Sequence, residues 1–355
     1  MENIELTKNF LNSNKILFGF SGILREYCSG KRDFTPVSIE IHPSAKCNHR
    51  CSHCSYARRN KKHTSIDRNV MENLITSIID MNIKAVYFSG GGEPSLYPDL
   101  AQYVERLFKN NIEIALLTNG SFLEKTGILD IAYMFNYIAV SVPSVDENTF
   151  QDITGTSYLQ KILSLPQTIK FAHKEKAPVI GARVVITGKI FREVLTILDV
   201  LKDKGFDYVL FKVVRDYEGT GLGITMQEES ELKTMISERD PFDDNYTNIN
   251  NLFSFKSLPV IQKCIINETG LIANVDTDGK VYPNIVEIGH EDFCIGDLNE
   301  SSLIEIWNSE QHQRVKAASQ KKCSAGLCEN CRAIAYNHVI QELLNKLPAK
   351  VDYFI

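Results

Sequence analysis

The stretch CNHRCSHC, residues 47–54, places three cysteines in one short loop with the spacing Cys-x3-Cys-x2-Cys. It follows SIEIH (38–42), an apolar run that predicts a β-strand. Thiolates are soft ligands that suit zinc or an iron–sulfur cluster. A closed zinc site needs a fourth ligand, which His49 or His53 can supply. A [4Fe–4S] cube is usually held by four cysteines, so three would leave one iron open to another ligand. The three cysteines are Cys47, Cys51 and Cys54.

Segments typical of strands and of helices alternate on both sides of this loop. The strand segments are rich in Val, Ile, Phe and Tyr, end in turn residues, and are separated by helical patterns, which predicts a parallel sheet. Six repeats predict an α/β fold in the form of a partial (β/α)6 barrel that is open on one side. The predicted strands are SIEIH (38–42), the start of KAVYFSGGGEP (84–94), IEIALLTNG (112–120), YIAVSV (137–142), PVIGARVVIT (178–187) and DYVLFKVV (207–214). The predicted helices are 65–82, a segment from Pro98, a segment after residue 120, most of 146–175, 191–205 and 227–238.

Polar and glycine residues mark the ends of these strands. SGGGEP (89–94) ends the second strand, Thr118-Asn119-Gly120 (118–120) ends the third, and Ser141 and Arg183 lie on the fourth and fifth. Ligands of parallel α/β folds gather at the carboxyl ends of the strands, and glycines allow a close approach of the backbone. Each position also has a plainer reading: a tight turn for the glycines, a buried hydroxyl for the serine, and a sheet-end ion pair for the arginine.

The second half of the chain carries a separate group of cysteines. After residue 215 the alternation stops, and the polar stretch DDNYTNINN (243–251) reads as a linker. LIANVDTDGKVYPNI (271–285) predicts two short strands around Asp278-Gly279. Helices are then expected over SSLIEIWNSEQHQRVKAAS (301–319) and 336–346. The cysteines of this group are Cys264, Cys294, Cys323, Cys328 and Cys331. A ninth cysteine, Cys28, stands alone and is expected to be a buried apolar residue.

Composition narrows the class of protein. The chain has 355 residues and a net charge of −5, with 43% hydrophobic residues, and no basic stripe that would favour a nucleic-acid partner. No run is long enough to cross a bilayer, and the first residues do not form a signal peptide. We therefore expect a cytoplasmic protein whose cysteines are not paired in disulfides. The expected domains are an N-terminal extension (1–36), the partial barrel (37–245), a hairpin-and-helix domain (246–335) and a C-terminal helix (336–355).

Cys47-x3-Cys51-x2-Cys54 after the first strand of a partial barrel resembles the radical S-adenosylmethionine (radical SAM) superfamily. SGGGEP resembles the family's glycine-glycine-glutamate motif, which implies that Gly91, Gly92 and Glu93 bind the amino group of S-adenosylmethionine. The resemblance implies a [4Fe–4S] cluster on the three cysteines, with the open iron bound to the same cofactor. The remaining cofactor contacts that it implies are Asn119 at the third strand end, Ser141 near the ribose and carboxylate, Arg183 at the carboxylate, and His53 near the adenine.

The second cysteine group resembles the C-terminal SPASM or twitch domains of radical SAM enzymes, which hold auxiliary clusters. The chain departs from that pattern at Asn284, because Gly279-x4-Asn284 stands where the family has Gly-x4-Cys. We therefore expect one auxiliary [4Fe–4S] cluster, and a zinc knuckle is the alternative. Its expected ligands are Cys264, Cys328 and Cys331, with either Cys294 or Cys323 as the fourth. The one that is left over, Cys294 or Cys323, is a candidate hydrogen-atom donor.

The resemblance implies reductive cleavage of S-adenosylmethionine to a 5′-deoxyadenosyl radical that removes a hydrogen atom from substrate. Oxidation or epimerisation is the expected outcome, and a one-electron reductant such as flavodoxin or ferredoxin is the expected partner. About 36 residues precede the first strand, which is short for an added peptide-binding domain, so a sugar, aminocyclitol or nucleoside is the expected substrate. A ribosomally made peptide is the alternative substrate. An iron–sulfur or zinc protein that transfers electrons or binds a partner is the non-enzymatic alternative. Residues that can contact substrate or form a solvated rim are Lys212, Arg215, Asp216, Tyr217 and Glu218.

Overall fold

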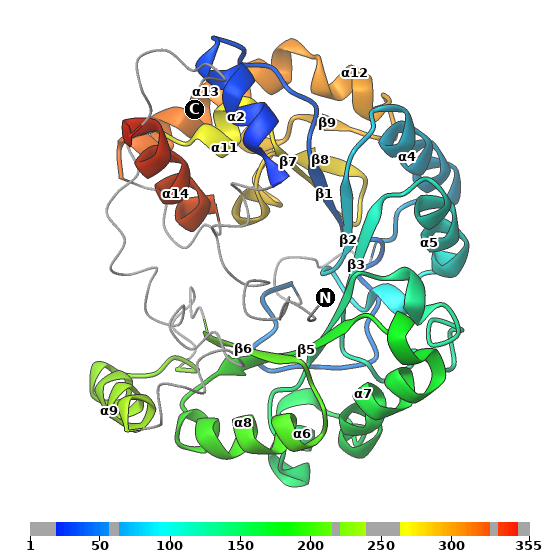
Figure 1. The fold of residues 1–355 in the computed structure, drawn as a ribbon, viewed down its shortest axis with the longest axis vertical. Helices are drawn as coiled ribbons and strands as arrows, with labels where there is room; N and C mark the ends of the chain where they lie inside the picture. Colours follow the sequence, from blue (N-terminus) through cyan, green and yellow to red (C-terminus); the bar gives the residue numbers. More distant parts are fainter. Residues whose placement is uncertain (1–18, 57–63, 215–220, 239–262, 327–332, 347–355) are drawn as a thin grey trace, which may run out of the picture. The chain divides into compact units, whose positions relative to one another are not determined.

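The computed structural model describes residues 19–56, 64–214, 221–238, 263–326 and 333–346 (Figure 1). The chain divides into two compact units that alternate along the sequence. We call Ile41–Asp67 with Lys84–Leu252 the barrel unit. We call Met1–Glu40, Arg68–Ile83 and Phe253–Ile355 the hairpin unit. The contiguous domain boundaries expected from the sequence stay a prediction.

The partial barrel is present as predicted, and the first six strands neighbour one another in chain order across the sheet. Their order across the sheet is β6-β5-β4-β3-β2-β1, and each neighbouring pair from β2 to β6 is parallel. The end of β1 continues into the barrel unit, where the carbonyl of Ile41 accepts a hydrogen bond from the amide of Ser89 at 3.0 Å. The strands are β1 (Ser38–Ile41), β2 (Ala85–Phe88), β3 (Glu113–Thr118), β4 (Tyr137–Ser141), β5 (Val179–Ile186) and β6 (Tyr208–Val213).

Burial alternates along β2 and the second half of β5, and it distinguishes the two faces of the sheet. On one face Leu116, Ile138 and Ile180 are fully buried, as side chains covered by helices must be. On the other face the register places Ser141 beside Arg183, and both retain solvent exposure. This second face is therefore the one that is open to a ligand.

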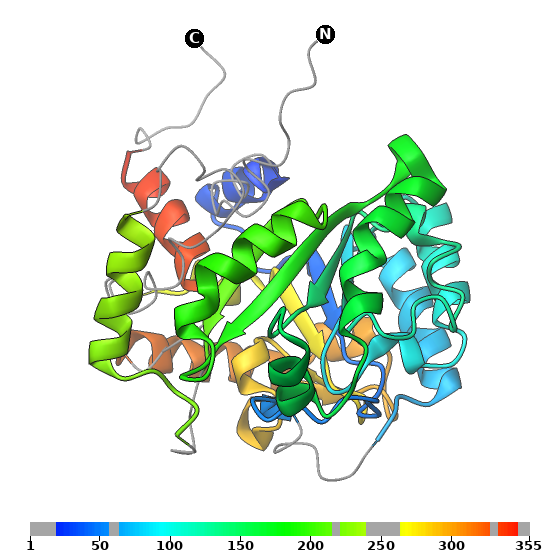
Figure 2. The same ribbon diagram turned by 90° about the horizontal axis from the view of Figure 1, so that it is seen from below.

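Helices on the outer side of β2–β6 cover the buried face (Figures 1 and 2). They are α5 (Leu100–Lys109), α6 (Glu147–Thr154), α7 (Leu159–His173) and α8 (Val194–Asp203), and α9 (Met226–Ser237) follows β6. Short 3-10 turns are η2 (Pro94–Leu96), η3 (Ala132–Met134), η4 (Lys174–Lys176) and η5 (Phe191–Glu193).

The helix predicted directly after β3 is wrong. Residues 121–131 form turns, and only η3 follows them before β4. Gly127 has φ +74°, a left-handed conformation that ends helical geometry, and the hydroxyl of Thr126 donates to the backbone carbonyl of Phe122. The other predicted helices are present within a few residues of their expected bounds.

The hairpin unit contains the antiparallel hairpin predicted around Asp278-Gly279. Val275 pairs with Val281 across the turn, and Gly279 adopts φ +87°. The strand order in this unit is β1-β7-β8-β9. The strands are β7 (Ile272–Val275), β8 (Lys280–Tyr282) and β9 (Gly296–Asp297). The helices are α2 (Ser21–Cys28), α4 (Arg68–Asp80), α11 (Ile265–Thr269), α12 (Leu303–Trp307), α13 (Glu310–Ser324) and α14 (Ala333–Lys346), with 3-10 turns η7 (Ile285–Glu287) and η8 (Glu291–Phe293).

A buried cluster joins α2, α11, α13 and α14 within this unit. It includes Leu24, Cys264, Cys323 and Ile340. Cys28 lies outside the cluster and is exposed, so the expectation that it is buried is wrong. The reason is its position at the last residue of α2, where Leu24 and Tyr27 face inward and the next residue does not. No helix in the described ranges is both long and apolar enough to span a bilayer.

Candidate functional site

The cysteine loop follows β1 and is fastened by backbone hydrogen bonds to the end of α6. The amide of Arg50 donates to the carbonyl of Thr154 at 2.7 Å, and the amide of Ser52 donates to that of Ile153 at 2.9 Å. Ser52 sits between Cys51 and Cys54, so these bonds hold the part of the loop that carries the second and third cysteines. The three thiols are thereby presented by backbone that a helix end supports.

The three thiols lie close enough to influence one another. Burial raises the pKa of Cys47, and burial together with the nearby Cys54 and Cys47 raises the pKa of Cys51 to about 12. Burial therefore favours the neutral thiols of Cys47 and Cys51, and a bound cation would reverse this preference by deprotonating them. Among the described residues no three His, Cys, Asp or Glu side chains converge closely enough to hold a single metal ion.

The two histidines of the loop differ in their surroundings. His49 has its Nε2 2.6 Å from the hydroxyl of Ser121 and stacks on Tyr158, and burial lowers its pKa to about 4. The imidazole of His49 therefore contacts Ser121, which follows the end of β3. Burial also lowers the pKa of His53 to about 4, and its Nδ1 is buried with no hydrogen-bond partner in the described part of the chain. Nδ2 of Asn48 is likewise buried and has no hydrogen-bond partner among the described residues.

Glu93 ties the end of β2 to the end of β3. Its carboxylate accepts hydrogen bonds from the hydroxyl of Thr118 at 2.6 Å and from the amide of Asn119 at 2.7 Å. The amide of Ser95 donates a third at 3.1 Å, and the residue is 2% exposed. Burial raises the pKa of this carboxyl. A carboxylate offers about four lone-pair positions, so one on Oε2 remains for a ligand.

Gly92 brings the β2 turn against the cysteine loop. A Cβ on this residue would lie 2.1 Å from the carbonyl oxygen of Lys46, and the amide of Glu93 donates to the same oxygen at 2.8 Å. Gly91 before it has φ +77°. The close approach that the glycines allow is thus made to the backbone beside Cys47.

Asn119 links the third strand to the first cysteine. Its Nδ2 donates to Oδ1 of Asn48 at 2.8 Å and lies 3.8 Å from Sγ of Cys47, and the amide of Ser121 donates to its Oδ1 at 2.9 Å. Sequence reasoning missed Asn48 and Ser121 as parts of this site. The only sequence feature that pointed to Asn48 is its position directly after Cys47 in the loop.

Ser141 and Arg183 lie side by side on the open face of the sheet, as register partners on β4 and β5. The charge of Arg183 acts on Tyr208, whose pKa burial nonetheless raises to about 12. The described contacts unite Cys47, Glu93 and Asn119 and do not join Ser141 or Arg183 to them. Lys212 is exposed on β6. The other four rim residues, Arg215, Asp216, Tyr217 and Glu218, lie outside the described residues.

In the hairpin unit α13 separates two of the candidate auxiliary ligands. The amide of Cys264 donates to Oε1 of Gln320, which lies one turn before Cys323 on the same face of α13. Cys294 instead contacts the first turn of α13, where Nε2 of Gln311 donates to its carbonyl at 3.0 Å. At 1.5 Å per residue the two contact points lie about 13 Å apart along the helix axis.

Cys294 and Cys323 differ in their burial and in the bonding of their sulfurs. Cys294 is half-buried, its Sγ lies 3.4 Å from the carbonyl of Gly296, and burial raises its pKa. Cys323 is buried and is held in a disulfide, so the expectation that the cysteines are unpaired is wrong for this residue. A disulfide sulfur must be reduced to a thiolate before it can bind iron. Cys328 and Cys331 lie outside the described residues.

The residues of the barrel unit fit a four-iron cluster with one open iron and a bound zwitterion. Three thiols supply the donors, and Oε2 of Glu93 keeps one acceptor position for an ammonium group. Two buried polar nitrogens of the loop, His53 Nδ1 and Asn48 Nδ2, lack partners among the described residues, although buried polar groups are nearly always satisfied. A ligand that reaches the loop would supply those partners.

Two family models match the chain. The model of the radical SAM superfamily matches residues 41–214. The model of an iron–sulfur cluster-binding domain, SPASM, matches residues 264–332. The first match covers the cysteine loop and all strand ends described above, and the second covers the five downstream cysteines.

Curated relatives are distant. A GTP 3′,8-cyclase of Aliarcobacter butzleri (strain RM4018) is 26% identical over 219 residues, which is 59% of this chain and 64% of that protein. An S-adenosylmethionine-dependent nucleotide dehydratase of Selenomonas ruminantium is 26% identical over 168 residues, 45% of this chain and 60% of that protein. The chain thus spans less than two thirds of either relative.

Solved structures share the fold. SuiB of Streptococcus suis bound to the precursor peptide SuiA superposes with a TM-score of 0.64 at 14% identity, covering 91% of this chain and 74% of that one. The enzyme anSMEcpe with bound AdoMet superposes with a TM-score of 0.63 at 18% identity, covering 88% and 93%.

Proposed function

The chain belongs to the radical SAM superfamily and carries a SPASM iron–sulfur domain, and from this premise we propose that it abstracts a hydrogen atom from a small polar substrate. The observation that carries the proposal is the convergence of Cys47, Glu93 and Asn119 at the carboxyl ends of three neighbouring strands. When bound and reduced, the cluster supplies the electron that cleaves S-adenosylmethionine to methionine and a 5′-deoxyadenosyl radical.

The chain's own residues bind and orient the cofactor in this proposal. Cys47, Cys51 and Cys54 hold three irons and leave the fourth open. Glu93 Oε2 accepts the methionine ammonium, beside backbone that Gly91 and Gly92 keep free of side chains. The other cofactor contacts in the proposal are His53 at the adenine, Asn119 beside the cluster loop, Ser141 near the ribose, and Arg183 at the carboxylate.

The first test is 5′-deoxyadenosine formation from S-adenosylmethionine under reducing, anaerobic conditions, measured by mass spectrometry. We expect the reconstituted wild type to form it and a Cys47/Cys51/Cys54→Ala variant to form none. Cys28→Ala is the matched control, because this cysteine is exposed on α2 and belongs to neither group. Product from the triple variant at the wild-type rate would refute the proposed site. An iron-loaded wild type that forms none would favour an electron carrier or binding protein.

For the auxiliary cluster we propose Cys264, Cys323, Cys328 and Cys331 as ligands. The support is α13, which places Cys323 next to the contact with Cys264 and Cys294 at its opposite end. Cys294 is then the thiol left over. Net oxidation requires that the substrate radical lose an electron, whereas epimerisation requires that a thiol such as Cys294 return a hydrogen atom. A Cys294→Ala variant separates the two, because only epimerisation should stop after one turnover.

The names of two curated relatives support the proposed class of substrate. Both are named for nucleotide substrates, a GTP 3′,8-cyclase and a nucleotide dehydratase, which supports a nucleoside or similar polar molecule. A ribosomally made peptide is the second candidate, because SuiB was solved with its precursor peptide. A screen of nucleosides, aminocyclitols, sugars and peptides for substrate-dependent 5′-deoxyadenosine decides between them. Flavodoxin and ferredoxin are the reductants to compare in that assay.

A further inference from the structure

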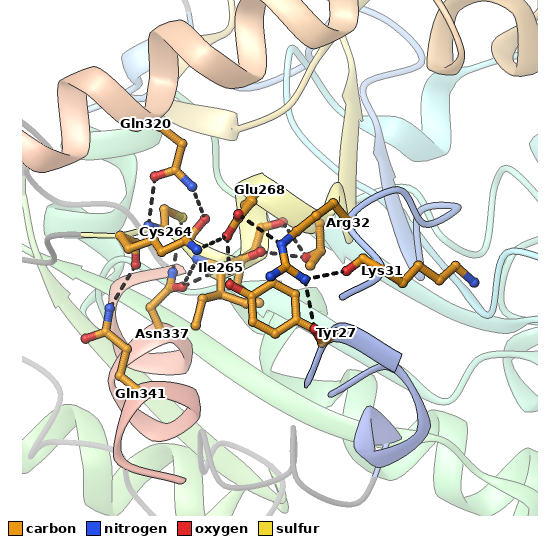
Figure 3. A network of polar contacts seen from close by, with 12 residues as sticks. Tyr27, Lys31, Arg32, Cys264, Ile265, Glu268, Gln320, Asn337 and Gln341 are labelled. Atoms are coloured by element: carbon orange, nitrogen blue, oxygen red, sulfur yellow. Dashed lines mark hydrogen bonds and ion pairs between the residues drawn. The ribbon is translucent and has the colours of Figure 1, made fainter. Parts of the chain in front are cut away.

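Cys264 of the hairpin unit is surrounded by side-chain amides that come from two other helices (Figure 3). Gln320 of α13 pairs with its peptide group in both directions, since the amide of Cys264 donates to Oε1 at 3.1 Å and Nε2 donates to its carbonyl at 2.8 Å. This two-way pairing repeats the hydrogen bonds between neighbouring strands of an antiparallel sheet. It fixes the backbone of Cys264 without touching its sulfur.

Asn337 of α14 reaches both the sulfur and the backbone that follows it. Its Nδ2 donates to Sγ of Cys264 at 3.2 Å and to the carbonyl of Ala333 at 2.8 Å. Its Oδ1 accepts from the amides of Ile265 at 2.7 Å and Ile266 at 3.3 Å. Two donors and two acceptor positions are all that an asparagine amide has, so every one is used.

The orientation of this amide is set by its partners. Backbone amides can only donate, so the oxygen must face Ile265 and Ile266, and the nitrogen must then face the sulfur. Asn337 is fully buried, and water cannot replace its hydrogen bonds. The donor to the sulfur is therefore a fixed part of the structure.

The far end of α11 is fastened as well, which makes the short helix a rigid support for the cysteine before it. Glu268 accepts a hydrogen bond from the hydroxyl of Tyr27 at 2.8 Å. Its carboxylate also forms an ion pair with Arg32 at 3.4 Å (Figure 3). A second ion pair joins it to Lys263 at 3.0 Å. Movement of the sulfur away from Asn337 would have to disturb contacts at both ends of α11.

We propose that Asn337 is a positioning residue for the auxiliary cluster, whose Nδ2–H donates to the ligand sulfur of Cys264 and raises the cluster's reduction potential. The proposal rests on the proposed function, in which Cys264 binds iron. Hydrogen bonds to the sulfurs are among the factors that set the potential of an iron–sulfur cluster. They stabilise negative charge on sulfur, and the reduced cluster carries more of it. The amide of Asn119 beside Cys47 shows the same chemistry in the barrel unit, at 3.8 Å.

The test uses full-length protein with Cys47/Cys51/Cys54→Ala, so that only the auxiliary cluster is present. In this parent we compare Asn337→Leu, which removes both functions of the amide, with Gln320→Leu, which removes only the backbone bonds. Gln341→Ala is the matched control, since Gln341 lies one turn further on α14 and donates to the carbonyl of Lys263. Iron per chain and the midpoint potential from an EPR-monitored redox titration are measured for each.

We expect Asn337→Leu to make the midpoint potential more negative, and Gln320→Leu and Gln341→Ala to leave it near the parent value. If Asn337→Leu does not fold, Asn337→Ala decides, because it removes the donor to sulfur without adding a charge and alanine favours a helix. An unchanged potential in the Asn337 variant that folds, with or without loss of iron, would reduce Asn337 to a structural cap and overturn the proposal. A parent that binds no iron would instead refute the proposed auxiliary cluster.

Discussion

At the scale of single residues, hydrogen bonds and close packing hold the residues of the candidate site in fixed positions. Glu93 receives three hydrogen bonds while buried, and Gly92 stands where the smallest side chain would meet a backbone oxygen. The motif SGGGEP therefore has two tasks in this chain. It offers a carboxylate lone pair to a ligand, and it seats the cysteine loop against the sheet.

Gly92→Ala tests the second task. The added Cβ would lie 2.1 Å from the carbonyl of Lys46, so the loop carrying Cys47 must move. We expect iron content to fall by about four per chain, which is one cube. Gly22→Ala in α2 is the control, because nothing lies within 4 Å of its Cβ and alanine favours a helix. Wild-type iron content in Gly92→Ala would contradict this role.

At the scale of elements, neighbouring strands and helices depend on specific small or buried residues where they meet. β5 and β6 pack closely because Gly181 makes room for the ring of Tyr208, its register partner. In the hairpin unit α12 and α13 meet at His312, whose Nδ1 bonds the carbonyl of Trp307 at 2.7 Å. These contacts hold the elements that carry Arg183 and Cys323.

Gly181→Ala should destabilise the barrel unit by about 1–3 kcal/mol, the usual range for overpacking. Its Cβ would lie 1.9 Å from the ring of Tyr208. Thermal unfolding measures the loss, and Gly188→Ala is the control, because its nearest neighbour lies at an ordinary 3.5 Å. In a Gly181→Ala/Tyr208→Ala double variant the two losses should not add, since the clash is absent. If the losses of stability in the two single variants add up in the double variant, the clash is not the cause of the destabilisation.

His312 should make stability depend on pH. Burial lowers its pKa below 6.5, with Lys316 acting in the same direction and Asp33 and the Trp307 carbonyl opposing it. The unfolded chain then binds a proton more readily than the folded one, so this contribution to stability is lost as pH falls through 6.5. In urea unfolding, the wild-type advantage over His312→Gln should shrink from pH 7.5 to 5.5.

The same substitution at the exposed His290 controls for the effect of replacing a histidine by glutamine. A wild-type advantage over His312→Gln that stays constant or grows toward acid pH would show that burial of the neutral imidazole does not govern this site.

At the scale of the whole molecule, each unit carries its own set of cysteines and supports it with amides from other elements. In the barrel unit Asn119 approaches Cys47, and in the hairpin unit Asn337 approaches Cys264. The curated relatives differ in chemistry according to their names, and the solved structures share the fold. The family matches identify a radical SAM domain and a SPASM domain, and the substrate has to be found by assay.

Iron counting in the Cys47/Cys51/Cys54→Ala parent tests the auxiliary ligands. Adding Cys323→Ala should remove the remaining irons, about four per chain. Adding Cys294→Ala should leave them in place, because α13 holds Cys294 far from the contact with Cys264. Cys264→Ala is the positive control. Loss of iron with Cys294→Ala and retention with Cys323→Ala would reverse the assignment.

The sequence by itself determined the features that depend on local pattern. Runs rich in Val, Ile, Phe and Tyr with turn residues at their ends predicted the six strands, the helical patterns between them predicted most helices, and Asp278-Gly279 predicted the hairpin. The cysteine spacing with SGGGEP identified the family, because a short loop and a glycine turn carry their chemistry within a few residues. The failures were also local in origin: the helix after β3 was overruled by Gly127 and side-chain hydrogen bonds, and Cys28 fell on the exposed side of a helix end.

Only the tertiary structure decided which distant residues meet. The bond from Asn119 to Glu93 spans 26 residues, and the one from Asn337 to Cys264 spans 73. No periodicity encodes such pairs, because they depend on how whole elements pack. The same holds for His49, which the sequence offered as a ligand and packing turns toward Ser121. Local geometry follows from neighbouring residues along the chain, whereas hydrogen bonds to a sulfur follow from the fold that brings two helices together.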